Sequence, residues 1–314
     1  MAWTPRDMGD LSGRTVVITG ANSGIGYCAA EELAAHGALV VLACRNLDKG
    51  RAALERIAKA HPGARVKLER LDVSSLDSVR AFADTILAAH PVIDVLVNNA
   101  GVMALPYQKT ADGFEMQFGT NHLGHFALTA SLWPGLVAAP APRVVTVASI
   151  AHHFGKIRFH DPCWEKGYSR WPAYAQSKLA NVLFAKELAR RAARAGVPVL
   201  SVACHPGYAS TNLQTSSSRA RGASFEEMIM SIGNHGLAQS AWRGALPTLY
   251  AATADVEPGE YYGPDGFLGL IGMPAKARTS KRANDPETAA KLWTLSEELT
   301  RMAFDVALPA SKSA

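Results

Sequence analysis

The chain has 314 residues, of which 48% are hydrophobic and 19% charged, so general disorder is excluded and one large or two small folded domains are expected. The formal net charge of +5 does not predict a nucleic-acid partner, because lysine and arginine are scattered without a dense basic block. The cysteines form no CxxC pair, which argues against a metal cage or a disulfide framework and favours reduced thiols in the cytoplasm. They are Cys28, Cys44, Cys163 and Cys204.

Two stretches bear on targeting. Residues 1–14 mix acidic and basic side chains and contain no apolar core, so they do not resemble a signal peptide. Residues 126–142 are the longest stretch without charge, but they contain three prolines and fall short of the ~20 apolar residues that a membrane span needs. We therefore expect a buried helix followed by a loop there, and no integral membrane span.

Short apolar runs typical of strands alternate with helical patterns along the chain. The expected strands are 15–19, 39–44, 66–73, 94–97, 144–147 and 199–204, and helices are expected up to about 36, at about 48–59 and at about 76–89. Such alternation predicts an α/β fold: a single doubly wound parallel-sheet Rossmann domain with right-handed crossovers. We assign residues 14–267 to this domain, 1–13 to an N-terminal extension and 268–314 to a helical C-terminal extension.

The first strand leads into Thr19-Gly20-Ala21-Asn22-Ser23-Gly24-Ile25-Gly26. Gly20 allows a tight turn, Gly24 allows the backbone to approach a pyrophosphate, and Gly26 allows close packing of helix and strand. The N-terminus of the following helix presents free N–H groups and a positive dipole end to phosphate. The pattern predicts a dinucleotide site, with a purely structural strand-to-helix turn as the alternative.

The end of the second strand indicates which dinucleotide is bound. A site selective for NAD usually has an acidic residue here, which binds the ribose 2′-hydroxyl. This chain has Arg45 followed by Asn46, and a guanidinium suits a 2′-phosphate. The sequence therefore predicts NADP rather than NAD. Alternatively, Arg45 is a surface residue or stacks on adenine without selecting a phosphate.

Tyr174 and Lys178 are four residues apart in a helical pattern and so share one helix face. A nearby ammonium favours the phenolate, which predicts a lowered pKa for Tyr174 and a role in proton transfer. By itself the pair has a plain alternative, because tyrosine and lysine at this spacing also occur by chance on solvated helix faces.

Together, these motifs resemble the short-chain dehydrogenase/reductase family. The residues that carry the resemblance are Thr19-Gly20-x-x-x-Gly24-Ile25-Gly26, Asn98-Asn99-Ala100-Gly101, Ser149 and Tyr174-x-x-x-Lys178, in the family's order. More narrowly, the chain is similar to the retinol dehydrogenase branch, which has protochlorophyllide reductase as a close relative. That similarity rests on Ala43-Cys44-Arg45-Asn46, Asn121-His122-Leu123-Gly124-His125-Phe126 and Ser177-Lys178-Leu179-Ala180-Asn181.

The resemblance implies a catalytic set of Asn121, Ser149, Tyr174 and Lys178. Tyr174 would be the general acid in carbonyl reduction and the base in alcohol oxidation, and Lys178 would lower its pKa and hold the nicotinamide ribose. Ser149 would stabilise the substrate oxygen, and Asn121 would anchor a water in a proton relay from Lys178. Judged from the residues alone, the alternatives are that Asn121 is a capping or core amide and that Ser149 ends a strand without a chemical role.

The resemblance also implies a set of cofactor contacts around the nucleotide. Asp72 and Val73, at the end of the third strand, would contact adenine, although a helix start capped by Ser74 or Ser75 is an alternative reading. Asn98 would close over the adenine ribose and support the sheet. The full set is Gly20, Asn22, Ser23, Gly24, Ile25, Gly26, Arg45, Asn46, Asp72, Val73, Asn98, Ala100, Gly101, Tyr174, Lys178, Pro206, Gly207 and Thr211.

Two features depart from the family's pattern. Ser23 occupies the place where many NADP-selective members carry a second basic residue, so selectivity would rest mainly on Arg45. Residues 152–171, between Ser149 and Tyr174, form a longer stretch than the shortest members have, and we expect an insertion near the mouth of the site. The histidines in and before this stretch have no metal-binding spacing, so no metal site is predicted.

The segments that follow the sixth strand bear on the substrate. Residues 208–237 predict a lid, polar at its hinge and apolar inside, although Phe225, Met228 and Met230 are equally suited to a core. Residues 261–266 are expected to form the last edge of the sheet, and the amphipathic pattern of 286–307 to pack onto protein. Whether the chain forms a homo-oligomer stays open.

The sequence thus predicts an NADP(H)-dependent oxidoreductase. It would transfer a hydride between nicotinamide and a hydrophobic carbonyl or alcohol, such as a retinoid, steroid or lipid-like molecule. The alternative is a nucleotide-sensing or scaffold protein that keeps the fold and the cofactor without useful turnover.

Overall fold

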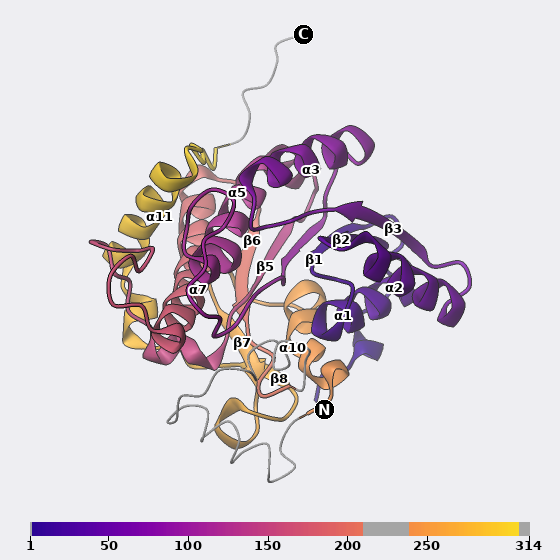
Figure 1. Ribbon diagram of the computed structural model, residues 1–314. Helices are drawn as coiled ribbons and strands as arrows, with labels where there is room; N and C mark the ends of the chain where they lie inside the picture. Colours follow the sequence, from indigo (N-terminus) through magenta and orange to yellow (C-terminus); the bar gives the residue numbers. More distant parts are fainter. Residues whose placement is uncertain (1, 210–238, 308–314) are drawn as a thin grey trace.

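The computed structural model describes residues 2–209 and 239–307 (Figure 1). The strands are β1 (Thr15–Thr19), β2 (Leu39–Cys44), β3 (Arg65–Arg70), β4 (Val95–Asn98), β5 (Arg143–Val147), β6 (Leu200–Cys204), β7 (Tyr261–Pro264) and β8 (Pro274–Lys276). The α-helices are α1 (Gly24–Ala35), α2 (Leu47–Ala60), α3 (Leu76–Ala89), α4 (Met116–Phe118), α5 (Gly124–Ser131), α6 (Trp133–Val137), α7 (Arg170–Ala195), α10 (Ala241–Thr253) and α11 (Pro286–Thr300). Shorter turns of helix are η1 (Pro5–Asp7), the π-helical η2 (Gly119–Leu123), η3 (Ile150–Phe154), η4 (Phe267–Gly269) and η5 (Lys281–Asn284).

One sheet connects the described strands in the order β3-β2-β1-β4-β5-β6-β7-β8. The pairings from β3 to β7 are parallel, and β8 pairs antiparallel with β7. The chain starts in the middle of the sheet with β1, runs outward to β3, and returns to β4 on the other side of β1. In open sheets of this kind, ligands bind outside the carboxyl ends of the strands, at the point where the order reverses.

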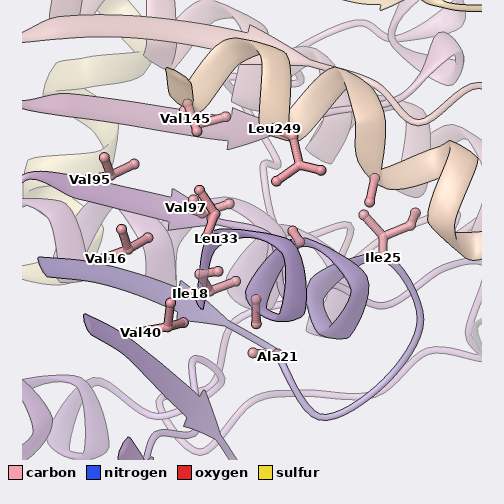
Figure 2. Close-up of a cluster of buried hydrophobic side chains, with 14 of the residues drawn as sticks. Val16, Ile18, Ala21, Ile25, Leu33, Val40, Val95, Val97, Val145 and Leu249 are labelled. Carbon is pink, nitrogen blue, oxygen red and sulfur yellow. The ribbon is translucent and has the colours of Figure 1, made fainter. Parts of the chain in front are cut away.

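Helices cover both faces of the sheet, which explains why its central strands are apolar throughout. Alternate residues of the central strands, such as Val16 and Ile18, face α1 and α10, with Leu33 and Leu249 packed above them (Figure 2). On the opposite face, Val17 and its counterparts pack against α3, α5 and α7. The predicted doubly wound fold is confirmed.

Most of the predicted elements are present, with two differences at the strand ends. The third strand ends at Arg70 rather than at residue 73, because Asp72 accepts hydrogen bonds from the backbone and side chain of Ser74 (3.0 and 2.6 Å) and turns the chain toward α3. The sheet also continues beyond residues 261–266, since β8 adds an antiparallel edge. Strand β8 therefore lies beyond residue 267, where the Rossmann domain was expected to end.

The apolar stretch at 126–142 forms buried helix and then loop, as expected. Its residues lie in α5 and α6, and Phe126, Trp133 and Leu136 belong to the core on the α3 face. Within the described part of the chain, no helix is both long enough and apolar enough to cross a bilayer.

Both terminal segments pack onto the domain. Near the N-terminus, Met8 is buried, and the ring of Trp3 meets that of Tyr250 edge-on at 5.3 Å. Near the C-terminus, α11 lies along α7 at the outer edge of the molecule (Figure 1). The expected lid, 208–237, falls almost entirely outside the described residues. At its two ends, Ala209 and Gln239 pair as a parallel bridge.

Trp293 is the main contact of α11 with the domain. Its ring is 2% exposed and stacks on Phe184 of α7 at 5.8 Å and on Phe304 at 4.8 Å. It also meets Phe126 edge-on at 5.1 Å, and the guanidinium of Arg191 lies over it at 4.4 Å. The predicted packing of 286–307 onto protein is therefore explained by contacts within the same chain.

We predict that Trp293→Ala lowers the free energy of unfolding by about 3–5 kcal/mol, because it removes a large buried ring and leaves a cavity between α7 and α11. Chemical denaturation followed by circular dichroism measures this. Thr294→Ala, at an exposed position on the same helix, is the control and should change stability little. Equal stability of the two variants would contradict the packing role given to Trp293.

Candidate active site

A cleft of about 340 Å³ opens at the carboxyl ends of the central strands. It extends from the end of β2, past the turn after β1, to the N-terminal part of α7. Its lining contains 15 of the predicted site residues: Gly20, Asn22, Ser23, Gly24, Ile25, Gly26, Arg45, Asn46, Asp72, Val73, Ala100, Gly101, Tyr174, Lys178 and Pro206.

The glycine turn is held closely against the end of β4. Gly20 has a φ of +67°, and a Cβ there would lie 3.0 Å from the Cα of Ala100. A Cβ on Gly26 would lie 2.4 Å from Nδ2 of Asn99, which donates to the carbonyl of Thr19 at 2.7 Å. The Thr19 hydroxyl in turn accepts from the backbone N–H groups of Asn99 (2.9 Å) and Ala100 (2.8 Å). Glycine is therefore required where the ends of β1 and β4 are tied together.

The N-terminus of α1 points its unpaired N–H groups toward this cleft. Ser23 is the N-cap, and among the described residues no side chain makes a capping hydrogen bond there. The first N–H groups of a helix have no partner within the helix, and they carry the positive end of its dipole. Because residues 23–26 line the cleft, this end of α1 is suited to an anion.

Two cations stand at the far end of the cleft. Arg45 and Lys49 both line it and are exposed, and in the described part of the chain neither has an ion-pair partner. Asn46 caps α2 by accepting from the backbone N–H of Lys49 at 2.9 Å. Sequence reasoning missed Lys49. Its position in the first turn of α2, just after Arg45 and the capping Asn46, was the available signal, since this places Lys49 in the same cleft as Arg45.

The remaining cofactor predictions divide between the cleft and its supports. Asp72 lines the cleft, but its carboxylate is bound to Ser74, and Ser75 is the N-cap of α3, as the alternative interpretation held. Asn98 is 1% exposed, does not line the cleft, and donates to the hydroxyl of Thr129 at 3.1 Å. The sheet-supporting part of its predicted role fits this position. The neighbouring Asn99, which was not predicted, is the residue at the cleft.

Three predicted residues concern the segment after β6. Pro206 lines the cleft, and its carbonyl accepts from Nε2 of Gln239 at 2.7 Å. Gly207 has a φ of +67° and lies outside the lining, directly against the backbone of Leu270. Thr211 lies outside the described residues.

Asn121 is completely buried within the π-helical turn η2. Its side chain clamps Val102, accepting from the backbone N–H at 2.8 Å and donating to the carbonyl at 2.9 Å, and it also donates to the Ser177 hydroxyl at 2.9 Å. The Oδ1 atom would lie 3.1 Å from a Cβ on Gly101. Its side chain thus acts as a core amide that joins the loop after β4 to α7. Single π-turns of this kind are frequent at functional sites.

Tyr174 lines the inner end of the cleft, whereas Ser149 lies outside the lining and reaches Tyr174 through a side-chain hydrogen bond. The Tyr174 side chain is 7% exposed, and burial raises its pKa to about 12, while a hydrogen bond with the Ser149 side chain offsets part of this effect. The predicted lowering of the Tyr174 pKa is therefore wrong for the chain itself. Nζ of Lys178 is 5.8 Å from the centre of the tyrosine ring, and desolvation of the phenolate outweighs its attraction.

Lys178 is 5% exposed and donates from Nζ to the carbonyl of Val147 at 3.1 Å. Asn181, one turn further along α7, donates to the same carbonyl at 3.1 Å. Burial lowers the pKa of Lys178 to about 8. The structure thus places a neutral phenol and an ammonium with a loosely held proton side by side. A neutral phenol beside such an ammonium can protonate an oxygen near neutral pH.

Comparison with known proteins identifies the family. A sequence model of the short chain dehydrogenases matches residues 14–222. Human retinol dehydrogenase 12 is 44% identical over 293 residues, which cover 92% of this chain and 87% of that protein. The chain belongs to the short-chain dehydrogenase/reductase family, in its retinol dehydrogenase branch.

Solved structures agree with this assignment. A structure of an uncharacterized protein from Mycobacterium paratuberculosis is 45% identical with a TM-score of 0.80, covering 97% of this chain and 99% of that one. A protein from Beutenbergia cavernae, described as an NAD(P) dependent gluconate 5-dehydrogenase and solved with NADP bound at low occupancy, is 27% identical with a TM-score of 0.60, covering 78% and 91%.

Membership of the family fixes the general chemistry. The chain is an oxidoreductase that transfers a hydride with a nicotinamide cofactor and acts on a small-molecule substrate. Within the described ranges there is no group of three or more His, Cys, Asp or Glu side chains that could hold a metal ion.

We predict that Lys178→Met stabilises the fold while destroying activity. The folded-state pKa of Lys178 lies below its usual 10.5, so the folded state binds this proton less tightly than the unfolded state does. Below about pH 8 the full penalty applies, and the variant should gain about 3 kcal/mol in the free energy of unfolding. Denaturation at pH 7 measures this.

Repeating the denaturation at higher pH tests whether the stability gain of Lys178→Met depends on pH in the expected direction. Between about pH 8 and 10.5 the folded wild type loses the Lys178 proton while the unfolded chain keeps it, so wild-type stability rises and the advantage of the variant shrinks. Lys49→Met, at an exposed cleft position, is the control and should not stabilise the fold at pH 7. A Lys178→Met variant less stable than wild type at pH 7 would contradict the argument.

Proposed function

We propose that the chain is an NADP(H)-dependent oxidoreductase that transfers a hydride between nicotinamide and a hydrophobic carbonyl or alcohol. The observation that carries the proposal is the pairing of two cations, Arg45 and Lys49, at one end of a single cleft with Tyr174 and Lys178 at the other. A dinucleotide with a third phosphate needs a cationic site at its adenosine end, and the reacting carbonyl needs a proton donor at the nicotinamide end.

The residues of the cleft fit such a cofactor. The uncapped N-terminus of α1 would hold the pyrophosphate, and the turn at Gly20 and Gly26 leaves no room for side chains that would block it. Arg45 and Lys49 would hold the 2′-phosphate, which supports NADP over NAD. Asp72 and Val73 lie where the adenine edge would be, and Ala100 and Gly101 where the adjoining ribose would be.

The proposed chemistry assigns one task to each catalytic side chain. When bound, the nicotinamide ring would supply or accept the hydride. Tyr174, a neutral phenol at pH 7, would donate its proton to the carbonyl oxygen as that oxygen gains charge, and Ser149 would hold the same oxygen by a hydrogen bond. Lys178 would bind the ribose hydroxyls, and its ammonium would supply the proton that Tyr174 has given up.

We propose that Asn121 binds the water of the proton relay through its main chain rather than its side chain. The side chain is fully occupied by Val102 and Ser177, so the relay from Lys178 to solvent would use a water bound to the backbone of η2. The carbonyl of Asn121 is contacted by Nδ1 of His125 at 3.0 Å, so such a water would use the second lone pair of that oxygen.

The substrate class is proposed from the surroundings of Tyr174. Tyr174 and Ala151 belong to one small apolar cluster, against which Met103 and Trp171 pack, and the Trp171 ring meets the Tyr174 ring edge-on at 6.2 Å. The similar human protein is named for retinol. We therefore propose a retinoid-, steroid- or lipid-like carbonyl or alcohol.

We also propose that the protein works in a reducing compartment, such as the cytoplasm. All four cysteines are free thiols, and Cys44 and Cys204 are buried in the core. Disulfides are rare where thiols are kept reduced.

If Arg45 and Lys49 hold a 2′-phosphate, replacing either should weaken NADPH binding and leave NADH binding unchanged. We expect the Kd for NADPH to rise about 10- to 100-fold for Arg45→Ala, since charge-assisted hydrogen bonds are lost, and less for Lys49→Ala. Fluorescence titration with both cofactors measures this. Arg51→Ala, an exposed site on α2 outside the cleft, is the control. Equal losses for NADPH and NADH would rule out the assigned role.

Tyr174→Phe tests the function itself. It removes only the hydroxyl, so kcat for NADPH-dependent reduction should fall by about 10²- to 10⁴-fold while the Kd for NADPH stays the same. The assay follows NADPH absorbance with a retinoid aldehyde, a steroid ketone, a long-chain aldehyde and a small hydrophilic carbonyl.

Tyr107→Phe, at an exposed tyrosine outside the cleft, should retain full activity. Normal turnover by Tyr174→Phe would refute the mechanism. NADPH binding with no turnover of any carbonyl or alcohol would favour the nucleotide-sensing alternative. Preference for the hydrophilic carbonyl would overturn the substrate class.

A further inference from the structure

His152 lies directly behind Ser149 and contacts its carbonyl twice. It belongs to η3, the turn that begins after Ser149, and it is completely buried. Its backbone N–H donates to the Ser149 carbonyl at 3.0 Å, and its ring nitrogen Nδ1 is 2.8 Å from the same oxygen. The Ser149 hydroxyl oxygen accepts from the backbone N–H of Ala151 at 3.2 Å. One short turn therefore fixes both polar groups of Ser149.

The partners of the His152 ring determine its protonation. A carbonyl only accepts, so Nδ1 must carry the hydrogen that binds Ser149. Nε2 is 3.3 Å from the backbone nitrogen of Ser280, which only donates, so Nε2 must be the acceptor. Only one neutral tautomer satisfies both contacts, and in it the Tyr261 hydroxyl, 3.5 Å from Nδ1, acts as an acceptor. Burial, which lowers the pKa of His152 to about 4, keeps the ring neutral at pH 7.

The contact with Ser280 comes from a distant part of the chain, 128 residues away. Ser280 is the N-cap of η5, and Arg282 of the same turn donates to the carbonyl of Gly155, at the end of η3, at 3.0 Å. The ring of Tyr261 packs edge-on against His152 at 5.0 Å. Residues 280–282 thus contact η3 at its middle and at its end, and they lie beyond residue 222, where the match to the family's sequence model ends.

We propose that His152 is a positioning residue for Ser149, and that the segment 280–284 braces it there. A hydroxyl that stabilises a reacting oxygen must be held within a fraction of an ångström, which requires a locked supporting contact. The contact of Nδ1 with the Ser149 carbonyl supplies that lock, and the Ser280 N–H fixes the tautomer that makes it. The inference rests on the role proposed above for Ser149.

Two substitutions of His152 separate its two contacts. Asparagine places an amide nitrogen close to the position of Nδ1, so His152→Asn should keep the bond to Ser149 and retain kcat close to wild type. Glutamine reaches the position of Nε2, so His152→Gln keeps a partner for Ser280 but loses the bond to Ser149. We expect His152→Gln to lower kcat about 10- to 100-fold, with the Kd for NADPH unchanged. Equal kcat in both variants, or losses that follow thermal stability, would overturn the proposal.

A double-mutant cycle shows whether His152 acts through Ser149. Ser149→Ala alone should lower kcat strongly, and adding His152→Gln to it should cause no further loss. If His152→Gln lowers kcat by the same factor in both backgrounds, the positioning role is wrong. If Ser149→Ala has normal kcat, the proposed role of Ser149 fails instead, so the two failures are distinguishable.

The brace is tested at Ser280, whose φ of −66° fits proline. Ser280→Pro removes the N–H that binds His152 together with the capping hydroxyl, whereas the matched control Ser280→Ala removes the hydroxyl alone. We expect kcat to fall in the proline variant and not in the alanine variant, with equal NADPH binding. Equal kcat in both variants would overturn the bracing role of residues 280–284.

Discussion

Burial of the Lys178 ammonium against the carbonyl of Val147 ties the chemistry of the site to the carboxyl end of β5. A buried ammonium lowers stability unless it is paired or hydrogen-bonded, and the hydrogen bond of Lys178 to the Val147 carbonyl compensates only part of this cost. Asn181 shares the same carbonyl, and Cys204 lies on the neighbouring strand at the paired position. The strand order, the long helix α7 and the packing behind it all keep this one charge at the edge of the sheet, where a ligand can reach it.

The same edge carries the other half of the site. Thr19 joins the ends of β1 and β4 through the backbone of Asn99 and Ala100, and this junction leaves space only for glycine at positions 20 and 26. The cleft is thus formed by backbone groups on one side and by α7 on the other. Its two ends differ in charge for separate reasons: exposed cations at the start of α2, and a desolvated phenol and ammonium in α7.

The sheet, its strands and most of the cleft follow from local patterns in the sequence, because apolar runs, glycine turns and a helical spacing of four are short-range signals. The sign of the Tyr174 pKa shift was not predictable, since it depends on how deeply distant segments bury the ring. For the same reason Asn98 was placed at the ligand instead of Asn99. Their side chains alternate along the strand end, and only the three-dimensional structure shows that Asn98 reaches Thr129. The contact between His152 and Ser280 spans the insertion and the C-terminal segment, for which no local pattern exists.

The packing of α11 has a consequence for how the protein folds during its synthesis. The face of α7 that carries Phe184 is covered by Trp293, and Trp293 by Phe304, so residues much later in the sequence cover the helix that bears Tyr174 and Lys178. During synthesis, domains fold as their segments emerge. Until about residue 304 has left the ribosome, a nascent chain would expose the aromatic rings of α5 and α7 to other chains, and α7 would lack its outer support. The aromatic rings of α5 and α7 therefore stay uncovered until residues 293–304 have been synthesised as well.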